Sequence, residues 1–413
     1  MKERLKAPEL RFPGFTDDWE ERKLGDFIKI SREQEVKKVD LHEEKIGYYV
    51  LAMRTFDFEG YIDYSKPYWI NNFESADGDL FLNRKEFAII DADMDASLPK
   101  IGKVLLNATN NKFLLAAHIR KIKVDVQVDS IFAYALMRTT ELVERLKLEA
   151  NGSISKRLLD KNVYKQKVYL PIHLEEQQQI GEFFWTLEET ITLHQRKLDL
   201  LKEQKKGYLQ KMFPKNGEKV PELRFAGFAD DWEERKFSDF TKLSQGLQIA
   251  ISDRFTEAGP NKEFYITNEF LNPNNTKKYY IENPSKNVIA NTNDILMTRT
   301  GNTGKVVTNT KGAFHNNFFK IDYDPKKISK LFLYFLLTSI PIQKEILIRA
   351  GTSTIPDLNH KDFYKIKVYL PIFEEQQRIG SFFKQLDDTI ALHQRKLDLL
   401  KEQKKGFLQK MFV

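Results

Sequence analysis

Two long stretches of the chain carry apolar residues at alternating steps of four and three. The first stretch runs from Ile180 to Met212 and the second from Ile379 to Met411. This heptad spacing predicts a helix with one apolar stripe that needs a partner helix. Pro171 and Pro371 open the two segments, so each helix is expected to begin just after its proline. A helix from Glu175 to Met212 would be about 57 Å long at about 1.5 Å per residue.

The two stripes match, which predicts that the helices pair with each other, antiparallel, as a coiled coil. Histidines stand on both stripes, where a polar residue that fixes the register explains them better than a metal ligand does. Two lysines, Lys205 and Lys404, are expected to lie at the edge of the stripe with their ammonium groups in water. The predicted seam consists of Leu187, Ile191, His194, Leu198 and Leu201 in the first helix and Leu386, Ile390, His393, Leu397 and Leu400 in the second.

The rest of the chain has the pattern of a mixed α+β fold. Short runs with alternating or β-branched residues predict strands, and longer apolar runs that follow them predict helices. The strands are expected within residues 86–91, 121–129, 320–324 and 365–371, and the helices at residues 130–148 and 330–348.

The chain is an uneven tandem repeat. Residues 8–27 match residues 221–240 at 16 of 20 positions, and LHQRKLDLLKEQKKG occurs without change at 193–207 and 392–406. Between these shared ends, the segments 31–164 and 241–364 cannot be aligned, apart from a faint echo of Gly102-Lys103-Val104 in Gly304-Lys305-Val306. We interpret the shared ends as doing the same job twice and the middles as doing different jobs.

The repeat divides the chain into two globular α+β domains, each followed by a long helix. Pro and Gly in residues 214–220 mark the linker between the halves. The predicted boundaries are 1–170 for the first domain, 171–213 for the first helix, 214–220 for the linker, 221–370 for the second domain and 371–413 for the second helix.

Composition narrows the class of protein. The 413 residues carry a net charge of +7, which fits a surface that meets a polyanion such as nucleic acid. Cysteine is absent, which excludes disulfides, thiol nucleophiles and cysteine-bound metals. The N-terminus has no apolar signal region, and the longest apolar run, Leu331–Leu337, is far too short to cross a membrane. We therefore expect a cytoplasmic protein without a membrane partner.

No catalytic or metal-binding pattern stands out. The cluster Asp91, Asp93, Asp95 begins like a calcium loop, but Ala96 and Gly102 occupy positions that require Gly and Glu. The loop 300–305 resembles a phosphate loop with the wrong glycine spacing. Hydrolase, dinucleotide and methyltransferase motifs are also absent from the sequence. The pattern favours a binding protein.

Turn residues in the two middles are the binding candidates. Arginine can read guanine and Asn or Gln can read adenine through paired hydrogen bonds, whereas Lys and Thr more often contact phosphate. The candidate DNA contacts are Arg54, Lys103, Asn107, Asn110 and Asn111 in the first middle and Gln245, Gln248, Arg299, Asn302, Thr303 and Lys305 in the second.

With these features the chain resembles the DNA-specificity subunit of type I restriction-modification enzymes. The resemblance rests on the paired PELRF…DDWEERK openings, the LPI…EEQQ helix starts at Leu170 and Leu370, and the repeated helix bodies. The stretch from Asp294 to Val306 is also similar to the family's recognition domains, whereas the first domain, with Ile90-Asp-Ala-Asp, departs from them.

The resemblance implies a noncatalytic chain with two target-recognition domains that read a bipartite, asymmetric site in double-stranded DNA. It also implies two methyltransferase subunits and, in the full enzyme, two restriction subunits as partners. S-adenosylmethionine, ATP and magnesium would belong to these partners, and this chain itself would hold no cofactor. Two other classes stay open: a coiled-coil scaffold or tandem DNA-binding protein outside restriction-modification, and a stand-alone enzyme.

Overall fold

The computed structural model describes residues 7–31, 41–64, 68–71, 73, 80–95, 97, 99–152, 155–215, 217–272, 274–351 and 354–413. Residues 1–6 lie outside this set. The expectation that the N-terminus carries no signal region rests partly on these residues. The chain forms two compact units, each of which combines a mixed α/β domain with segments of both long helices. The first unit is Met1–Leu200 with Leu392–Val413, and the second is Leu201–Ala391.

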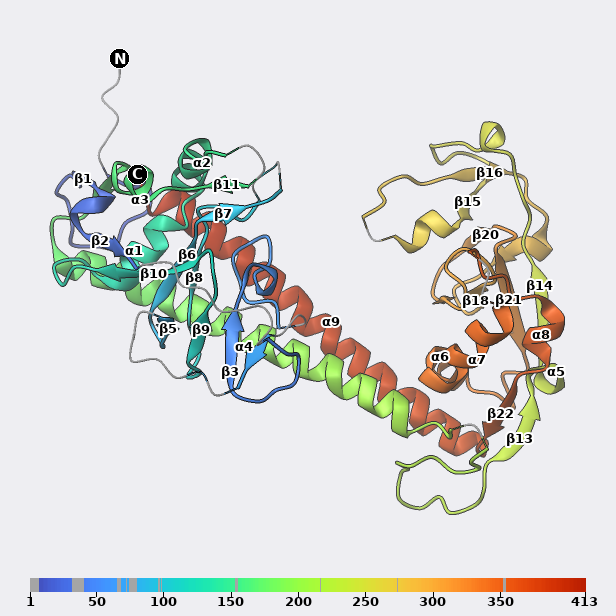
Figure 1. Ribbon diagram of the computed structural model, residues 1–413. Coiled ribbons are helices and arrows are strands. Elements are labelled where there is room, and N and C mark those ends of the chain that lie inside the picture. Colours follow the sequence, from blue (N-terminus) through green and yellow to red (C-terminus); the bar gives the residue numbers. More distant parts are fainter. Residues whose placement is uncertain are drawn as a thin grey trace. The chain divides into compact units, whose positions relative to one another are not determined.

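Before the first long helix begins, the first unit contains short strands and the three short α-helices α1, α2 and α3 (Figure 1). Its elements are β1 (Glu20–Lys23), β2 (Ile28–Ile30), β3 (Tyr48–Leu51), β4 (Trp69–Ile70), β5 (Phe81–Leu82), β6 (Phe87–Ile90), β7 (Ala92–Asp93), β8 (Val104–Leu106), β9 (Phe113–Leu115), β10 (Ile119–Val124), α1 (Ser130–Met137), α2 (Thr140–Leu148), β11 (Lys156–Arg157), α3 (Asp160–Tyr164), β12 (Lys167–Leu170) and the start of α4 (Leu174–Lys211).

Two sheets organise this domain. One has the strand order β2-β10-β6-β8 and is antiparallel throughout. The other has the order β4-β3-β9-β5, in which β3 and β9 run parallel. Two-stranded pairings join β1 to β12 and β7 to β11.

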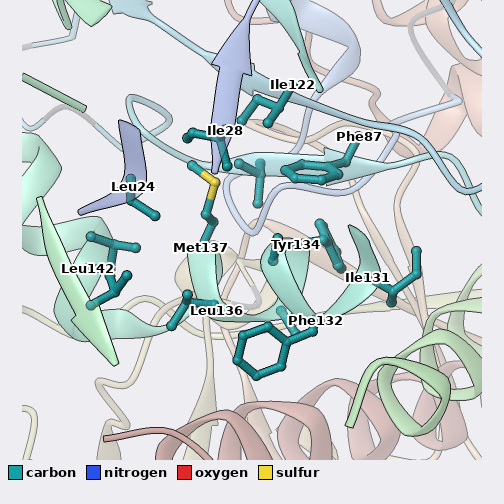
Figure 2. Close-up of a cluster of buried hydrophobic side chains, with 14 of the residues drawn as sticks. Leu24, Ile28, Phe87, Ile122, Ile131, Phe132, Tyr134, Leu136, Met137 and Leu142 are labelled. Carbon is teal, nitrogen blue, oxygen red and sulfur yellow. The ribbon is translucent and has the colours of Figure 1, made fainter. Parts of the chain in front are cut away.

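The helix α1 forms the centre of the first core. Seven of its eight residues, Ile131 to Met137, are buried, so this helix is apolar around its whole circumference. Figure 2 shows Tyr134 and Met137 on the side of the strands that carry Ile28 and Phe87, with Phe132 on the opposite side. The helix therefore lies between the sheet and the long helices, and it attaches the domain to them.

The second unit repeats this arrangement (Figure 1). Its elements are β13 (Glu233–Lys236), α5 (Phe237–Phe240), β14 (Thr241–Gln245), β15 (Lys262–Ile266), β16 (Tyr280–Glu282), β17 (Ile289–Ala290), β18 (Ile295–Thr298), β19 (Val306–Val307), β20 (Gly312–Phe314), β21 (Phe318–Tyr323), α6 (Lys330–Thr338), α7 (Ile340–Ala350), α8 (His360–Tyr364), β22 (Lys367–Leu370) and the start of α9 (Phe373–Lys410).

The middles that cannot be aligned by sequence have the same strand order. The sheet β14-β21-β18-β19 corresponds to β2-β10-β6-β8, and β16-β15-β20-β17 corresponds to β4-β3-β9-β5, including the parallel pair β15 with β20. The faint Gly-Lys-Val echo falls at the same point of both sheets, immediately before β8 and β19. Sheet pairing depends on backbone hydrogen bonds and on burial, so one frame accommodates unrelated side chains.

Three boundaries differ from the prediction. Each helix expected at 130–148 and 330–348 is two helices, broken after Met137 and Thr338, and α6 and α7 meet at 62°. In the second unit Ser339 is extended and Pro341 opens α7, where its missing N–H costs nothing. The strand expected to extend to residue 129 ends at Val124, because the chain turns there to place Asp129 as the N-cap of α1.

The long helices and their antiparallel pairing are confirmed, with α4 and α9 each 38 residues long. In the first unit the Phe183 and Phe407 rings are 4.8 Å apart at their centroids, and the Nδ1 atoms of His194 and His393 are 3.2 Å apart. In the second unit Lys205 Nζ lies 2.5 Å from an Asp387 carboxylate oxygen. Within each unit, higher residue numbers in α4 meet lower numbers in α9.

The repeated helix starts hold each domain on its helix. In the first unit Arg11 donates two hydrogen bonds to the buried Glu176, at 2.6 and 2.8 Å, and the Gln177 side chain accepts from the Asp129 backbone at 3.1 Å. A Cβ on Gly181 would lie 2.3 Å from an Asp129 carboxylate oxygen, so only glycine permits this approach. The counterparts in the second unit are Arg224 with Glu375, Gln376 with Ser329, and Gly380 beside Phe332.

In the first unit, residues near 410 bond to residues near 10 and pack into the first core. The Leu10 amide donates to the Lys410 carbonyl at 2.8 Å, and the Phe412 ring packs on Trp19 and Phe132 in the first core. The second unit has the same bond between Leu223 and the carbonyl of Lys211.

Candidate nucleic-acid interface

The second domain gathers its predicted contacts at one end of a sheet, where β14 and β18 end and β21 and β19 begin. We call this end the second loop edge; it consists of residues 245–248, 299–305 and 315–317. Gln245 pairs in register with Phe319, and Arg299 directly follows the strand that pairs with Phe318. Gln245, Gln248, Asn302 and Lys305 are exposed there, while Arg299 and Thr303 are half-buried. The structure thus brings all six predicted residues of this domain together.

The backbone around Arg299 is held by three hydrogen bonds. Its amide donates to the Asn317 carbonyl at 2.7 Å, and its carbonyl accepts from the Leu358 amide at 2.9 Å and from the Thr303 hydroxyl at 3.1 Å. The Arg299 guanidinium donates to both carboxylate oxygens of Asp357, at 3.0 and 2.7 Å. This residue therefore has a fixed position at the surface.

The turn before β19 is fixed by its glycines and by α7. Gly304 has φ of 88°, and its carbonyl accepts from the Gln343 side chain at 2.8 Å. The Thr303 hydroxyl also donates to the Pro356 carbonyl at 2.7 Å. Asn302 and Lys305 project from this turn without a side-chain hydrogen bond to the described part of the chain.

Several residues of this edge escaped the sequence reasoning. The Asn316 amide donates to Gln248 at 3.1 Å, and the Asn268 amide donates to the Thr300 carbonyl at 3.0 Å. Within the described residues, the remaining oxygens of these two amides and the Nε2 atom of His360 are buried without a partner. Burial first, and then the charge of Arg299, lower the pKa of His360. A weak signal for this region lay in the repeat, since DLNHKDFYK at 357–365 is identical to RLLDKNVYK at 157–165 at four of nine positions.

The first domain has the same edge with different chemistry. Asp91 takes the backbone place of Arg299: its amide donates to the His118 carbonyl at 3.1 Å and its carbonyl accepts from the Leu158 amide at 2.7 Å. The Asp91 carboxylate is buried and lies 3.4 Å from Arg120 and 4.0 Å from Arg157. The pair Asp91 with Arg157 thus reverses the polarity of Arg299 with Asp357. In the sequence alone, Asp91 stands out only as a candidate calcium ligand.

The predicted contacts of the first domain are not brought together. Lys103 precedes β8, whereas Asn107, Asn110 and Asn111 follow it, at the other end of the strand. The Lys103 ammonium donates to the Phe58 carbonyl, and burial lowers its pKa. Asn110 and Asn111 are exposed.

Like Lys103, two more of the predicted side chains already have internal partners. Asn107 has no exposed surface; its amide donates to the Leu82 and Asn111 carbonyls, and its oxygen accepts from Thr109. This residue therefore braces the turn and offers no atom to a base. Arg54 donates to the Tyr68 hydroxyl at 2.8 Å and to Glu43 at 3.0 Å.

The predicted seam residues are distributed over both units. Ile191, Leu198, Leu201 and Leu397 are buried, and Leu187 packs against the first core. Leu386, Ile390 and Leu400 are half-buried, as are His194 and His393, whose rings face one another.

The two stripe lysines differ in their surroundings. Lys404 is wrongly expected in water: its side chain is 2% exposed and donates to Glu188, which is 3% exposed. Lys205, in the identical sequence of α4, is 25% exposed beside Asp387.

Among the described residues, no single helix is both long enough and apolar enough to cross a membrane. The bent pair α6 and α7 reaches that length and apolar composition only when its two helices are taken together.

The fold and the two edges define a tandem recognition protein, in which one domain topology occurs twice with different loop chemistry. The chain belongs to the type I restriction modification DNA specificity domain family, whose model matches residues 16–203 and 229–402. The chain is thus a specificity subunit of a type I restriction-modification system, and this family is generally noncatalytic.

Relatives and solved structures agree. The chain is similar to a putative type I restriction enzyme specificity subunit, MjaX, of Methanocaldococcus jannaschii, with 23% identity over 409 residues that cover 95% of this chain and 92% of the relative. The MjaVIII specificity subunit of the same organism is 25% identical over 199 residues, 48% of this chain and 45% of that one. The crystal structure of the type I S subunit from M. genitalium has the same fold, with a TM-score of 0.66, 16% identity and coverage of 98% and 99%.

Proposed function

We propose that this subunit reads a bipartite, asymmetric sequence in double-stranded DNA, with residues 1–170 reading one half-site and residues 221–370 the other. The observation that carries the proposal is the pair of loop edges, which share a backbone frame but place Asp91 in one domain where Arg299 stands in the other. A true twofold dimer would present the same side chains twice and would require a palindrome. Two different edges on one chain fit two different half-sites.

The second loop edge supplies the chemistry that DNA reading needs. Amides and a guanidinium can form paired hydrogen bonds with base edges, and an exposed ammonium suits a phosphate. We therefore retain Gln245, Gln248, Arg299, Asn302, Thr303 and Lys305 as proposed contacts, and Arg54, Lys103, Asn110 and Asn111 in the first domain. Asn107 leaves the set because it is fully buried.

The long helices are the proposed recruitment surface. Leu193 and Leu200 of α4 and Leu392 and Leu399 of α9 are exposed, and they occur in the identical helix sequence. Exposed leucines one heptad apart form a stripe that suits another helix. Two identical stripes suit two identical partners, the methyltransferase subunits, with two restriction subunits joining the full assembly. S-adenosylmethionine, ATP and magnesium would serve these partners, and the assembly would act on DNA in the cytoplasm.

A domain exchange tests the function. Residues 31–164 are replaced by the matching segment of a relative, and a second variant exchanges residues 241–364. In each assembled methyltransferase, mapping of methylated adenines should show one changed half-site and one unchanged half-site. Loss of sequence preference in both half-sites, in a soluble and assembled variant, would contradict separate reading.

A binding measurement separates the scaffold alternative. The purified subunit is titrated with duplex DNA at low and high salt. Phosphate contacts release counterions, so affinity should fall steeply as salt rises. A chain that binds no duplex at any salt would be a scaffold.

A further inference from the structure

We propose that Arg299 reads a guanine in the half-site of the second domain and that Asp357 is its positioning residue. The inference rests on the proposed function, because it assigns a base to one of the proposed DNA contacts. It adds the identity of the base, the edge of the guanidinium that reads it, and a residue outside the predicted contact set.

The hydrogen-bond pattern divides the guanidinium into two edges. Asp357 accepts from Nε at 3.0 Å and from Nη2 at 2.7 Å, so the carboxylate occupies the side edge. A guanidinium has five N–H donors; three of them are left, and the end edge presents one from Nη1 and one from Nη2. No hydrogen bond within the described residues engages Nη1. This free edge has the geometry that pairs with O6 and N7 of guanine in the major groove.

The surroundings hold the guanidinium in place. The Arg299 side chain is 22% exposed, and its guanidinium carbon lies 5.7 Å from the centre of the buried Phe319 ring. His360 packs edge-on against the same ring, with centroids 4.6 Å apart. A side chain fixed by packing and by a carboxylate loses little conformational entropy when it binds a base.

The first domain shows that the ion pair can be reversed without loss of the frame. At the same backbone positions it has Asp91 and Arg157, and both domains keep the bond from the Leu158 or Leu358 amide to the preceding loop. The buried carboxylate of Asp91 has no donor for guanine. The two half-sites should therefore differ at the base pair that this position faces.

The decisive variant reverses the pair in the second domain, Arg299→Asp with Asp357→Arg. The reversed pair keeps the attraction that holds residues 299 and 357 together, but it moves the donors away from the reading position. The assembled methyltransferase should lose its preference for one G·C pair in the second half-site by about 5- to 150-fold, the range for one bidentate contact. The first half-site should not change. Reversal of the neighbouring pair, Glu345→Arg with Arg349→Glu, is the matched control and should leave every base preference intact.

A second variant tests the positioning role. Asp357→Asn removes a negative charge, so binding to random duplex should become tighter and more salt-dependent, while preference for the G·C pair weakens. Asp357→Glu should restore much of the preference. A carboxylate that only stabilises the fold would not change affinity and selectivity in opposite directions.

Three results would overturn the inference: a second half-site without a G·C pair, an unchanged base preference in the reversed variant, or a uniform loss of affinity for all sequences after Arg299→Ala. The last result would indicate a phosphate contact. The proposed function fails separately, if the unmodified assembly shows no sequence preference at all.

Discussion

Replacement of Lys404 by Met tests whether the buried ion pair holds the first unit together. The Lys404 ammonium contacts Glu188 and lies 3.3 Å from the Tyr61 and Tyr134 hydroxyl oxygens. Without the lysine, Glu188 would stay buried with the Tyr134 hydroxyl as its remaining donor in the described structure. Removal of one partner of a buried pair costs about 3–5 kcal/mol, because the other charge stays out of water.

The chain supplies its own control in Lys205→Met. Lys205 occupies the same place in the same fifteen-residue sequence, so the change in helix propensity is identical. The Lys205 and Asp387 side chains are 25% and 31% exposed, and a partly exposed pair is worth about 0–1 kcal/mol. The same substitution should therefore destabilise the first unit about 3 kcal/mol more than it destabilises the second.

Native-state hydrogen exchange measures the two units separately. In Lys404→Met, the amides of α1 should exchange about two to three orders of magnitude faster, while Lys205→Met should change those of α6 by less than about tenfold. The double variant Lys404→Met with Glu188→Leu should recover most of the protection, because it removes both charges and keeps the volume. Equal effects of the two lysine variants, or no recovery in the double variant, would refute the reasoning.

Two further predictions concern the helices. Gly181→Ala should lower the urea midpoint of unfolding, because the added Cβ would clash with Asp129. Gly207→Ala places its Cβ where no atom lies within 4 Å, so it should raise the free energy of unfolding by about 0.5–1 kcal/mol. A lowered midpoint for both variants would show that the close approach at residue 181 is not decisive. Burial first, and then Lys396 and His393, lower the pKa of His194. As the pH falls below about 6.5, the unfolded chain binds a proton at His194 that the folded chain does not, so the free energy of unfolding should fall. In urea titrations from pH 7 to 5, His194→Gln should show a shallower fall than the unmodified chain. An equal fall would assign the effect to other groups.

The sequence predicted the parts of the fold that depend on local pattern. The predicted bounds of both long helices lie within three residues of the observed ends, because an apolar stripe on a helix is a local property. The sequence could not distinguish Lys404 from Lys205, since the same fifteen residues bury Lys404 in the first unit and leave Lys205 partly exposed in the second. That difference comes from Tyr61 and Tyr134, which belong to a domain far away in the sequence.

The candidate site shows the same limit. The six candidates of the second domain lie together because they occupy turns that follow strands, where side chains reach the surface, and their DNA contacts stay a prediction. Asn107 was misleading, since an asparagine that braces a turn has the same sequence signature as one that reads adenine. The equivalence of Asp91 and Arg299 was invisible because backbone hydrogen bonds, not side chains, define it.

The closure of the first core by residues around 410 imposes a delay during synthesis. Leu408, Met411 and Phe412 complete the cluster that contains Trp19 and Phe132, yet they are synthesised after all its other members. At roughly 5–20 residues per second, the roughly 190 residues between the two parts of the first unit take about 10–40 s to emerge. For that time the first domain has an open apolar face, while the second unit, continuous in sequence, can close as soon as it is made. The domain that is translated first is therefore the one that completes its core last.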